Sequence, residues 1–281
     1  MTPSLELAPQ TRTAGLLLFP DMTQLDLTGP LEVLGRLPGW RVEIVAPSRA
    51  PVRTDKGLVI QPDADFAGAS AYDLFVVPGG PGTDEAMLDP QIVGFVRERA
   101  LAAKYIFGIC TGSLLLGAAG LLNGRRAGGH WQARGLLSRF GAIPSDQRLT
   151  IDGNLYTSGG VTAGIDMALR VAAEVAGEDV AQQIQLQIEY DPEPPFQAGT
   201  PFVAPRAIVE RALQATAVRR AIRAAAVEKA ARGSGGLRHM PSTGRGHVST
   251  PTPKLRAVER ARQSDRGIEP RAGGVPDDVK P

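Results

Sequence analysis

Four short apolar runs, each closed by a proline or a glycine-containing turn, most constrain the fold of this chain of 281 residues. They lie at residues 14–19, 42–46, 74–77 and 105–109. Helical apolar spacing occupies the gaps at residues 23–37 and 90–103. Continuous apolar strands that alternate with amphipathic helices are typical of a parallel sheet covered on both faces. The pattern predicts an α/β fold.

The remaining segments add hairpins and helices to this plan. Turn residues 55–57 predict a short hairpin over 52–60, and Asp152-Gly153-Asn154 predicts another over 149–157. Helical patterns are expected at residues 131–140, 162–176 and 179–189, followed by a proline-rich stretch from Asp191. Residues 207–231 are alanine-rich and favour one further helix.

The charge distribution separates the C-terminal part from the rest. Residues 206–281 carry 16 Lys and Arg against 7 Asp and Glu, whereas residues 1–205 carry 15 against 22. We expect an α/β domain over 12–205, a C-terminal helix over 206–232 that packs on or next to it, and a disordered basic tail over 233–281, where glycine, proline and serine are frequent. The basic tail leaves nucleic-acid binding open as a lesser alternative.

Cysteine usage and hydropathy indicate the compartment. The chain has one cysteine, which excludes an intramolecular disulfide and fits a reducing environment. Residues 1–12 lack the apolar region of a signal peptide, and no apolar run reaches the roughly 18 residues of a membrane span. These features predict a cytoplasmic protein without membrane contact.

The single cysteine, Cys110, lies between a buried strand and a helix of small and aliphatic residues. A free cysteine is often only a small buried apolar side chain. A strand–turn–helix elbow, however, presents the nucleophile in unrelated hydrolases, and ligands bind at the carboxyl ends of parallel strands. We therefore predict a nucleophilic Cys110, with the thiolate favoured by the helix N-terminus.

Two further segments are predicted to meet at the same sheet edge. Gly79 and Gly80 follow the strand at 74–77, and their N–H groups, with that of Thr111, are candidates for binding substrate or developing negative charge. An ordinary strand-end turn is the alternative. Asp26 is either a helix cap or a carboxyl that exchanges protons, with a pKa raised by burial.

Of the three histidines, His130 is the one that lies outside the tail. It is a candidate base for Cys110 or a helix cap, and with Trp131 it is a candidate substrate-binding residue. The sequence has no phosphate-binding loop and no cysteine–histidine set with zinc spacing. We expect neither a metal nor another cofactor.

Five segments together resemble the ThiJ/PfpI superfamily and, within it, the isonitrile hydratases. They are FPDMTQLDLTGPLEVL (19–34), VVPGGPG (76–82), ICTGSLLLGAAGLLNGRRAGGHW (109–131), DGNLYTSGGVTAGIDMAL (152–169) and QLQIEYDPEPPFQAGTP (185–201). The resemblance covers residues 14–230. It implies a flavodoxin-like three-layer sandwich of the class I glutamine amidotransferase-like type, with a mostly parallel sheet.

The resemblance also implies an activity and its residues. The nucleophile of the family falls on Cys110, its acid/base aspartate on Asp26 and its neighbouring threonine on Thr111. It implies a hydro-lyase that hydrates a small isocyanide to an N-substituted formamide, and a homodimer. Gly128 and Gly129 depart from the family, which usually carries two threonines there.

Two other classes of function remain open from the sequence. One is a non-catalytic redox or ligand sensor in which Cys110 is modified as a signal. The other is a relative of the AraC-type transcription regulators that contain a similar domain. The glycine- and proline-rich tail does not match their C-terminal pair of helix-turn-helix units.

Overall fold

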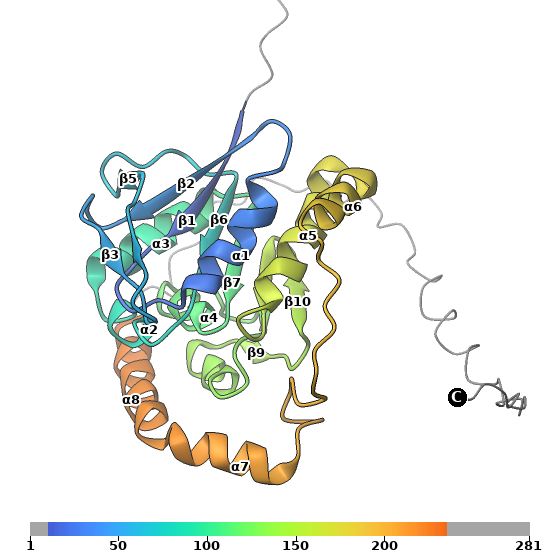
Figure 1. The fold of residues 1–281 in the computed structure, drawn as a ribbon. Coiled ribbons are helices and arrows are strands. Elements are labelled where there is room, and N and C mark those ends of the chain that lie inside the picture. The colour runs from blue at the N-terminus through green and yellow to red at the C-terminus, as the bar shows by residue number, and fades with distance from the viewer. Residues whose placement is uncertain (1–10, 235–281) are drawn as a thin grey trace, which may run out of the picture. The chain divides into compact units, whose positions relative to one another are not determined.

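Seven strands form the central sheet of this computed structural model, in the order β10-β11-β7-β6-β1-β2-β5 (Figure 1). The structure describes residues 11–234. The strands of this sheet are β1 (Arg12–Leu17), β2 (Trp40–Ala46), β5 (Ala64–Asp65), β6 (Leu74–Val77), β7 (Tyr105–Ile109), β10 (Leu149–Asp152) and β11 (Leu155–Ser158). Neighbouring strands run parallel except β10 and β11, which form an antiparallel hairpin. The predicted mostly parallel sheet is confirmed.

Two small sheets lie beside the central one. β3 (Val52–Arg53) pairs antiparallel with β4 (Val59–Ile60), as the turn residues predict. β8 (Arg126–Ala127) pairs parallel with β9 (Ile143–Pro144).

The helices cover both faces of the sheet. They are α1 (Gln24–Leu34), α2 (Thr83–Ala86), α3 (Pro90–Ala102), α4 (Gly112–Ala118), α5 (Ala163–Ala176), α6 (Glu178–Gln187), α7 (Arg206–Ala215) and α8 (Ala217–Ser234), with the 3₁₀ helix η1 at Arg134–Phe140. α1 and α5 pack against each other on one face, and α3 and α4 do so on the other (Figure 1). The predicted three-layer sandwich is confirmed.

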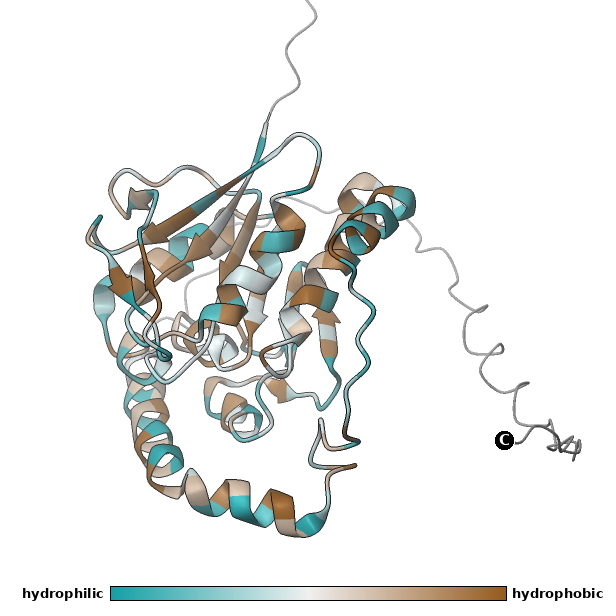
Figure 2. Ribbon diagram, viewed as in Figure 1, coloured by the Kyte–Doolittle hydropathy of each residue, from teal (hydrophilic) through white to brown (hydrophobic). Residues whose placement is uncertain are grey.

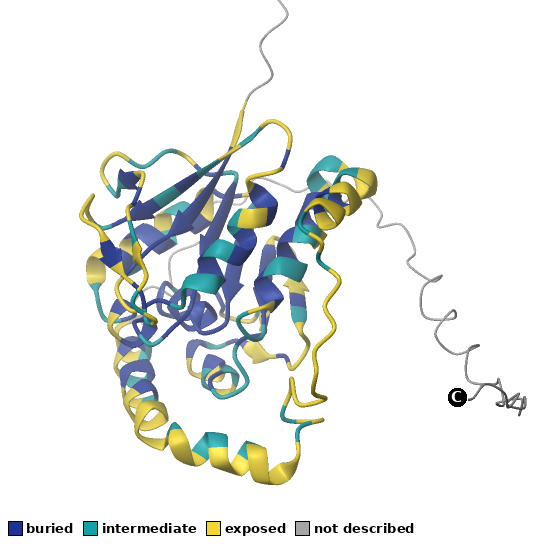
Figure 3. Cartoon of the chain, in the orientation of Figure 1, coloured by how far each residue is buried: buried dark blue, intermediate teal, exposed yellow. Residues whose placement is uncertain are grey.

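The core follows from the apolar runs. Leu16, Phe75 and Phe107 come from three adjacent strands and are buried. Strand β6 is brown in Figure 2 and dark blue in Figure 3, because its residues are apolar and buried. This burial holds the carboxyl ends of β1, β6 and β7 side by side.

Two helical predictions differ from the structure. Residues 131–140 form turns and η1 rather than an α-helix, and the Leu136 N–H already donates to the Ala133 carbonyl in the shorter i→i+3 pattern. The predicted helix over 207–231 is broken at Thr216 into α7 and α8. The Thr216 hydroxyl donates to the Ala212 carbonyl at 2.7 Å, a local bond that competes with regular helix geometry.

The two C-terminal helices differ in their packing. No side chain of α7 is buried, whereas α8 contacts α2, α4 and η1 (Figure 3). The tail predicted to be disordered over 233–281 lies outside the described residues, apart from its first two, which end α8. Within the described residues, no helix has the length and hydropathy needed to cross a bilayer.

Candidate active site

The predicted site residues meet at the carboxyl ends of three adjacent strands. Asp26 lies in the first turn of α1, which follows β1. Gly79 and Gly80 follow β6, and Cys110 follows β7. Because β1, β6 and β7 are neighbours in the sheet, the loops that follow them meet at one edge.

Cys110 occupies a strained elbow. Its φ of 57° is in the left-handed region, which non-glycine residues rarely adopt. Its N–H donates to the Ser158 carbonyl, and its own carbonyl accepts from the His130 N–H at 3.1 Å. At Gly112, a Cβ atom would lie 2.1 Å from the Val77 carbonyl oxygen, so the turn into α4 requires glycine there. The surrounding backbone therefore fixes the direction of the thiol.

Asp26 is fully buried and bound to the second loop. Its Oδ2 accepts from the Gly79 N–H at 2.8 Å, and Oδ1 is buried without a hydrogen bond of regular geometry to the described residues. The N-cap of α1 is Thr23, so capping is not the role of Asp26. This carboxyl is anchored on one oxygen and leaves the other for chemistry.

The environment of Asp26 brings its pKa close to neutrality. Burial raises its pKa to about 7 against the lowering effects of the Gly79 N–H and the Cys110 thiol, and the charge of Asp55 adds to the increase. The sequence-based expectation of a raised pKa agrees with this value. At about 7, both protonation states of the carboxyl are populated under physiological conditions.

The thiol itself differs from the prediction. Burial raises the pKa of Cys110 well above its ordinary value, and the nearby Asp26 charge raises it further. The Thr111 N–H and the Arg223 charge lower the pKa, but they do not overcome desolvation. The predicted resting thiolate is wrong: the helix N-terminus contributes one donor, whereas burial removes the water that would solvate the anion. The raised pKa favours the thiol form of Cys110, next to the buried Asp26 carboxyl.

Thr111 connects the elbow to the glycine loop. Its Oγ1 accepts from the Gly80 N–H at 2.8 Å and lies 3.0 Å from the Thr83 hydroxyl oxygen. A Cβ atom on Gly79 would lie 2.4 Å from the Thr111 nitrogen, which explains the close approach of the two loops. The N–H groups of Gly79 and Gly80 thus donate hydrogen bonds within the protein, to Asp26 and to Thr111 respectively.

His130 and Trp131 lie beside the elbow, where the His130 N–H donates to the Cys110 carbonyl. The Nδ1 of His130 accepts from the Gln132 N–H at 3.4 Å, and the His130 and Trp131 ring centroids are 6.0 Å apart. Burial lowers the pKa of His130, as does the Arg223 charge, which favours the neutral imidazole. Asp26 is therefore the better candidate for proton exchange with Cys110.

The two glycines that depart from the family adjoin this site. A Cβ atom on Gly129 would lie 3.0 Å from the Cys110 carbonyl oxygen, and one on Gly128 would lie 3.1 Å from Thr150 Oγ1. Both distances are tight but adjustable. Side chains at these positions would displace the wall next to Cys110 by a few tenths of an ångström.

Sequence reasoning missed Arg223 and Asp84. The Nε of Arg223 lies 2.6 Å from Asp84 Oδ1, and its Nη2 donates to the Gly80 carbonyl at 3.1 Å. A signal was present: Arg219 and Arg223 are spaced four residues apart in a helix whose Val227 is buried. Nothing in the sequence indicated which loop this helix face contacts.

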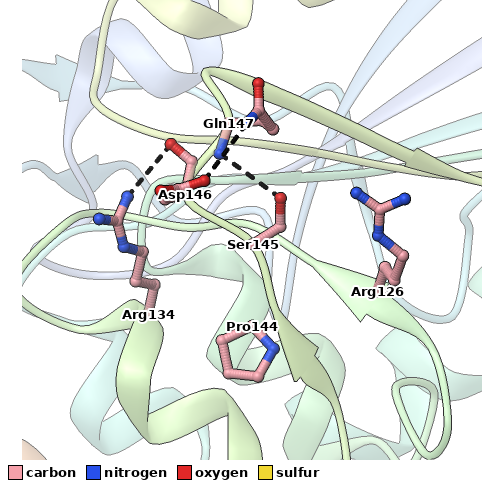
Figure 4. Close-up of a pocket in the computed structure, with 6 residues that line it drawn as sticks. All are labelled: Arg126, Arg134, Pro144, Ser145, Asp146 and Gln147. Carbon is pink, nitrogen blue, oxygen red and sulfur yellow. Dashed lines mark hydrogen bonds between the residues drawn. The ribbon is translucent and has the colours of Figure 1, made fainter.

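A separate hollow of about 400 Å³ is lined by none of the predicted site residues and contains no cysteine (Figure 4). It is lined by Arg126, Arg134, Pro144, Ser145, Asp146 and Gln147. Within residues 11–234 there is no group of three or more histidine, cysteine, aspartate or glutamate side chains that could hold a metal ion.

A parallel sheet covered on both faces, with a buried cysteine at the strand–helix elbow, defines a class of α/β proteins. The family model of the DJ-1/PfpI family matches residues 12–174, and the chain belongs to this family. The match spans β1 through most of α5 and includes every residue predicted for the site.

Individual relatives agree with this assignment. The chain is 48% identical to the isonitrile hydratase of Pseudomonas putida, over 72% of this chain and 89% of that protein. The crystal structure of a ThiJ/PfpI family protein from Pseudomonas syringae has a TM-score of 0.75 and 39% identity, covering 81% of this chain and 96% of that one. The transcriptional regulator GbdR of Pseudomonas aeruginosa is 30% identical over 65% of this chain, which spans about half of the regulator's length (53%).

Proposed function

We propose that this protein hydrates an organic isocyanide to the N-substituted formamide, with Cys110 as the nucleophile and Asp26 as the acid and base. The observation that carries the proposal is the pairing of a strained, buried Cys110 with an Asp26 carboxyl whose pKa is about 7. The similarity to the Pseudomonas putida isonitrile hydratase supports the choice of substrate.

The first half of the reaction joins Cys110 to the substrate. The Asp26 carboxylate accepts the thiol proton as the sulfur attacks the terminal isocyanide carbon. Asp26 then delivers this proton to the same carbon, which gives a thioimidate in which carbon is bonded to sulfur, hydrogen and nitrogen. Carboxylate–thiol and carboxyl–thiolate differ only in the position of one shared proton, so the pair starts with the right number of protons.

The second half releases the product. Asp26 accepts a proton from water as the oxygen adds to the thioimidate carbon, and it delivers this proton to the substrate nitrogen. In the resulting tetrahedral adduct the hydroxyl proton passes to Asp26 as the carbonyl forms and the carbon–sulfur bond breaks. Asp26 returns this proton to the Cys110 sulfur, which leaves the N-substituted formamide and the free thiol. Atoms and charges balance for the addition of one water molecule.

Thr111 and the glycine loop position these groups. The Thr111 N–H donates toward the Cys110 sulfur and lowers the pKa of the thiol, so it stabilises the anion that forms during attack. The Gly79 N–H holds Asp26, and the Gly80 N–H holds the Thr111 side chain. We assign Gly79 and Gly80 to orientation of the catalytic groups, and His130 and Trp131 to the substrate-binding wall.

The test is turnover of cyclohexyl isocyanide by the purified protein, with formamide followed by chromatography. We expect product from the wild type and none from Cys110→Ala. Equal product from both proteins would overturn the cysteine mechanism. The proposed hydration reaction would be wrong if the wild type forms no product although it is folded and has a titratable thiol.

The alternative of a redox sensor has less support. Susceptible cysteines combine thiolate character with exposure. Cys110 is only 6% exposed, and its raised pKa disfavours the thiolate, so it lacks both properties of a susceptible cysteine. Intact-mass analysis after mild peroxide treatment tests this alternative, which predicts rapid and specific oxidation of Cys110.

We further propose that the protein is a cytoplasmic homodimer. Several large apolar side chains of the C-terminal part are exposed, which supports burial against a second copy. They are Phe196, Phe202, Val203, Ile208, Val218 and Ile222. A single unpaired cysteine fits a reducing compartment. Light scattering of the purified protein tests the dimer, and a monomeric mass at micromolar concentration would contradict it.

A further inference from the structure

Helix α8 brings a buried cation to the active-site loops from more than a hundred residues along the chain. Arg223 is 9% exposed and comes from a helix whose buried residues Ala226, Val227 and Ala230 lie against the domain. It makes one bond to a side chain, Asp84, and one to the backbone, the Gly80 carbonyl. Buried arginine is rarely tolerated without such partners.

The Gly80 peptide is the contact that matters for the site. Its carbonyl accepts from Arg223 at 3.1 Å and from the Thr111 hydroxyl at 3.2 Å. Its N–H donates to Thr111 Oγ1 at 2.8 Å. The φ of Gly80 is 131°, a conformation that glycine adopts readily and other residues rarely do, so the loop can turn here. Arg223 is thus two hydrogen bonds from the residue next to the nucleophile.

The charge of Arg223 also acts on the site. It lowers the pKa of the Cys110 thiol and of His130. The other charged group that acts on the thiol is Asp26, which raises its pKa. Asp84 pairs with Arg223 at 2.6 Å, and Arg219 lies 3.6 Å from the other Asp84 oxygen. Two arginines therefore share one carboxylate, and Arg223 is the one that also reaches the Gly80 carbonyl.

We propose that Arg223 is a positioning residue for the Cys110 site, which holds the Gly80 peptide and through it Thr111, and which presents a positive charge to the sulfur during attack. The C-terminal helix is then part of the reactive centre rather than an appendage to the domain. The proposal rests on the proposed role of Cys110 as nucleophile.

The test compares Arg223→Met with Arg219→Met. Both changes remove a cation that pairs with Asp84, but Arg219 is half exposed, and Arg223 is the one of the two that donates to the Gly80 carbonyl. The primary readout is the pH titration of the thiolate by ultraviolet absorbance, taken as the difference from the same protein carrying Cys110→Ala, so that the absorbance of the four tyrosines cancels. It needs no isocyanide turnover, so its outcome is separate from that of the proposed function.

We expect Arg223→Met to raise the pH midpoint of thiolate formation. At a pH below the thiol midpoints of both the wild type and Arg223→Met, carbamidomethylation of Cys110 should be about tenfold slower in the variant. This factor corresponds to an increase of one unit in the thiol pKa. The kcat for isocyanide hydration should fall by a similar factor, with a smaller change in KM. Arg219→Met should leave the thiol titration as in the wild type. Arg223→Lys should retain the thiol midpoint but lose part of kcat, because an ammonium keeps the positive charge but cannot bond to Asp84 and the Gly80 carbonyl with the geometry of a guanidinium.

Removal of Arg223 alone leaves the half-exposed Arg219, 3.6 Å away, as the remaining cation at the buried Asp84, and this weaker pairing can prevent folding. The double variant Asp84→Asn/Arg223→Met removes both charges and keeps the measurement possible. A raised thiol midpoint in this folded variant supports the proposal. A wild-type titration in it, or in a folded Arg223→Met protein, would overturn the proposal and leave Arg223 as a partner of Asp84 only.

Discussion

The Cys110 site and the arginine-lined hollow differ in almost every physical property. The hollow is open and polar, and its lining comes from one continuous part of the chain, residues 126–147. The Cys110 site is buried and strained, and its residues come from the ends of three adjacent strands and from α8. The hollow contains a serine but no cysteine. Reactivity depends on desolvation and fixed geometry rather than on open volume.

This contrast is sharpest for the nucleophiles that each region offers. Cys110→Ser keeps the shape of the elbow but replaces a thiol with a much weaker acid, and we expect isocyanide hydration to fall by at least about 10³-fold. Ser145→Ala removes the buried hydroxyl of the hollow and is the matched control, with an unchanged rate. Formamide production by both variants at similar rates would erase the distinction between the two regions.

Asp26→Asn tests the second member of the pair. Asparagine can still accept from the Gly79 N–H, but it cannot exchange a proton. We expect kcat/KM to fall about 10²- to 10⁴-fold, the usual contribution of a general acid and base. Asp146→Asn, in the hollow, should retain full activity. A loss that is equal in the two variants would place the proton transfer elsewhere.

The pH dependence follows from the pKa of about 7 for Asp26. Below this pH both Cys110 and Asp26 carry protons, and no acceptor is available for the thiol proton. We expect kcat/KM to rise about tenfold per pH unit up to about 7 and then to level off, and we expect Asp26→Asn to lack this limb. A pH profile flat from 5 to 8 in the wild type would contradict the shared-proton mechanism.

Stability should change with pH in the opposite direction to activity. The folded-state pKa of Asp26 is raised from 3.8 to about 7, so folding favours the protonated carboxyl. The stability that this group contributes is fully present below pH 3.8 and is lost as pH rises to about 7. Asp26→Asn should therefore be more stable than the wild type above neutrality, by up to about 4 kcal/mol. Thermal unfolding of both proteins at pH 5 and pH 8 measures the difference, which should be larger at pH 8.

The smallest effect is expected in the hollow itself. Arg126→Gln removes an exposed cation, and we expect stability to stay within about 0.5 kcal/mol and activity to remain unchanged. A loss of turnover in this variant would show that the hollow takes part in substrate binding. The conclusion that activity depends on the Cys110 site and not on the hollow would then be wrong.

Much of the fold was predictable from local pattern. Residues 74–77 and 105–109 form strands as predicted, because a short apolar run closed by a turn has few other stable arrangements. Residues 207–231 were less predictable. Their alanine content favours a helix throughout, but it gives no indication of the break at Thr216, where the hydroxyl bonds to the backbone. The 3₁₀ helix at Arg134–Phe140 was missed for a similar reason: it depends on a hydrogen-bond pattern that apolar spacing does not distinguish.

The sequence by itself determined the alternating strands and helices, the elbow at Cys110 and the meeting of the Asp26, Gly79 and Cys110 segments at one sheet edge. These features depend on local pattern and on the parallel arrangement of the strands. Only the tertiary structure decided the state of the thiol and the position of Arg223. Burial sets the balance between desolvation and charge at Cys110, and it is a property of the whole packed domain. The contact between α8 and the Gly80 loop joins residues 143 positions apart in the chain. The sequence of a helix face shows that it is apolar or charged, but not which distant loop it contacts.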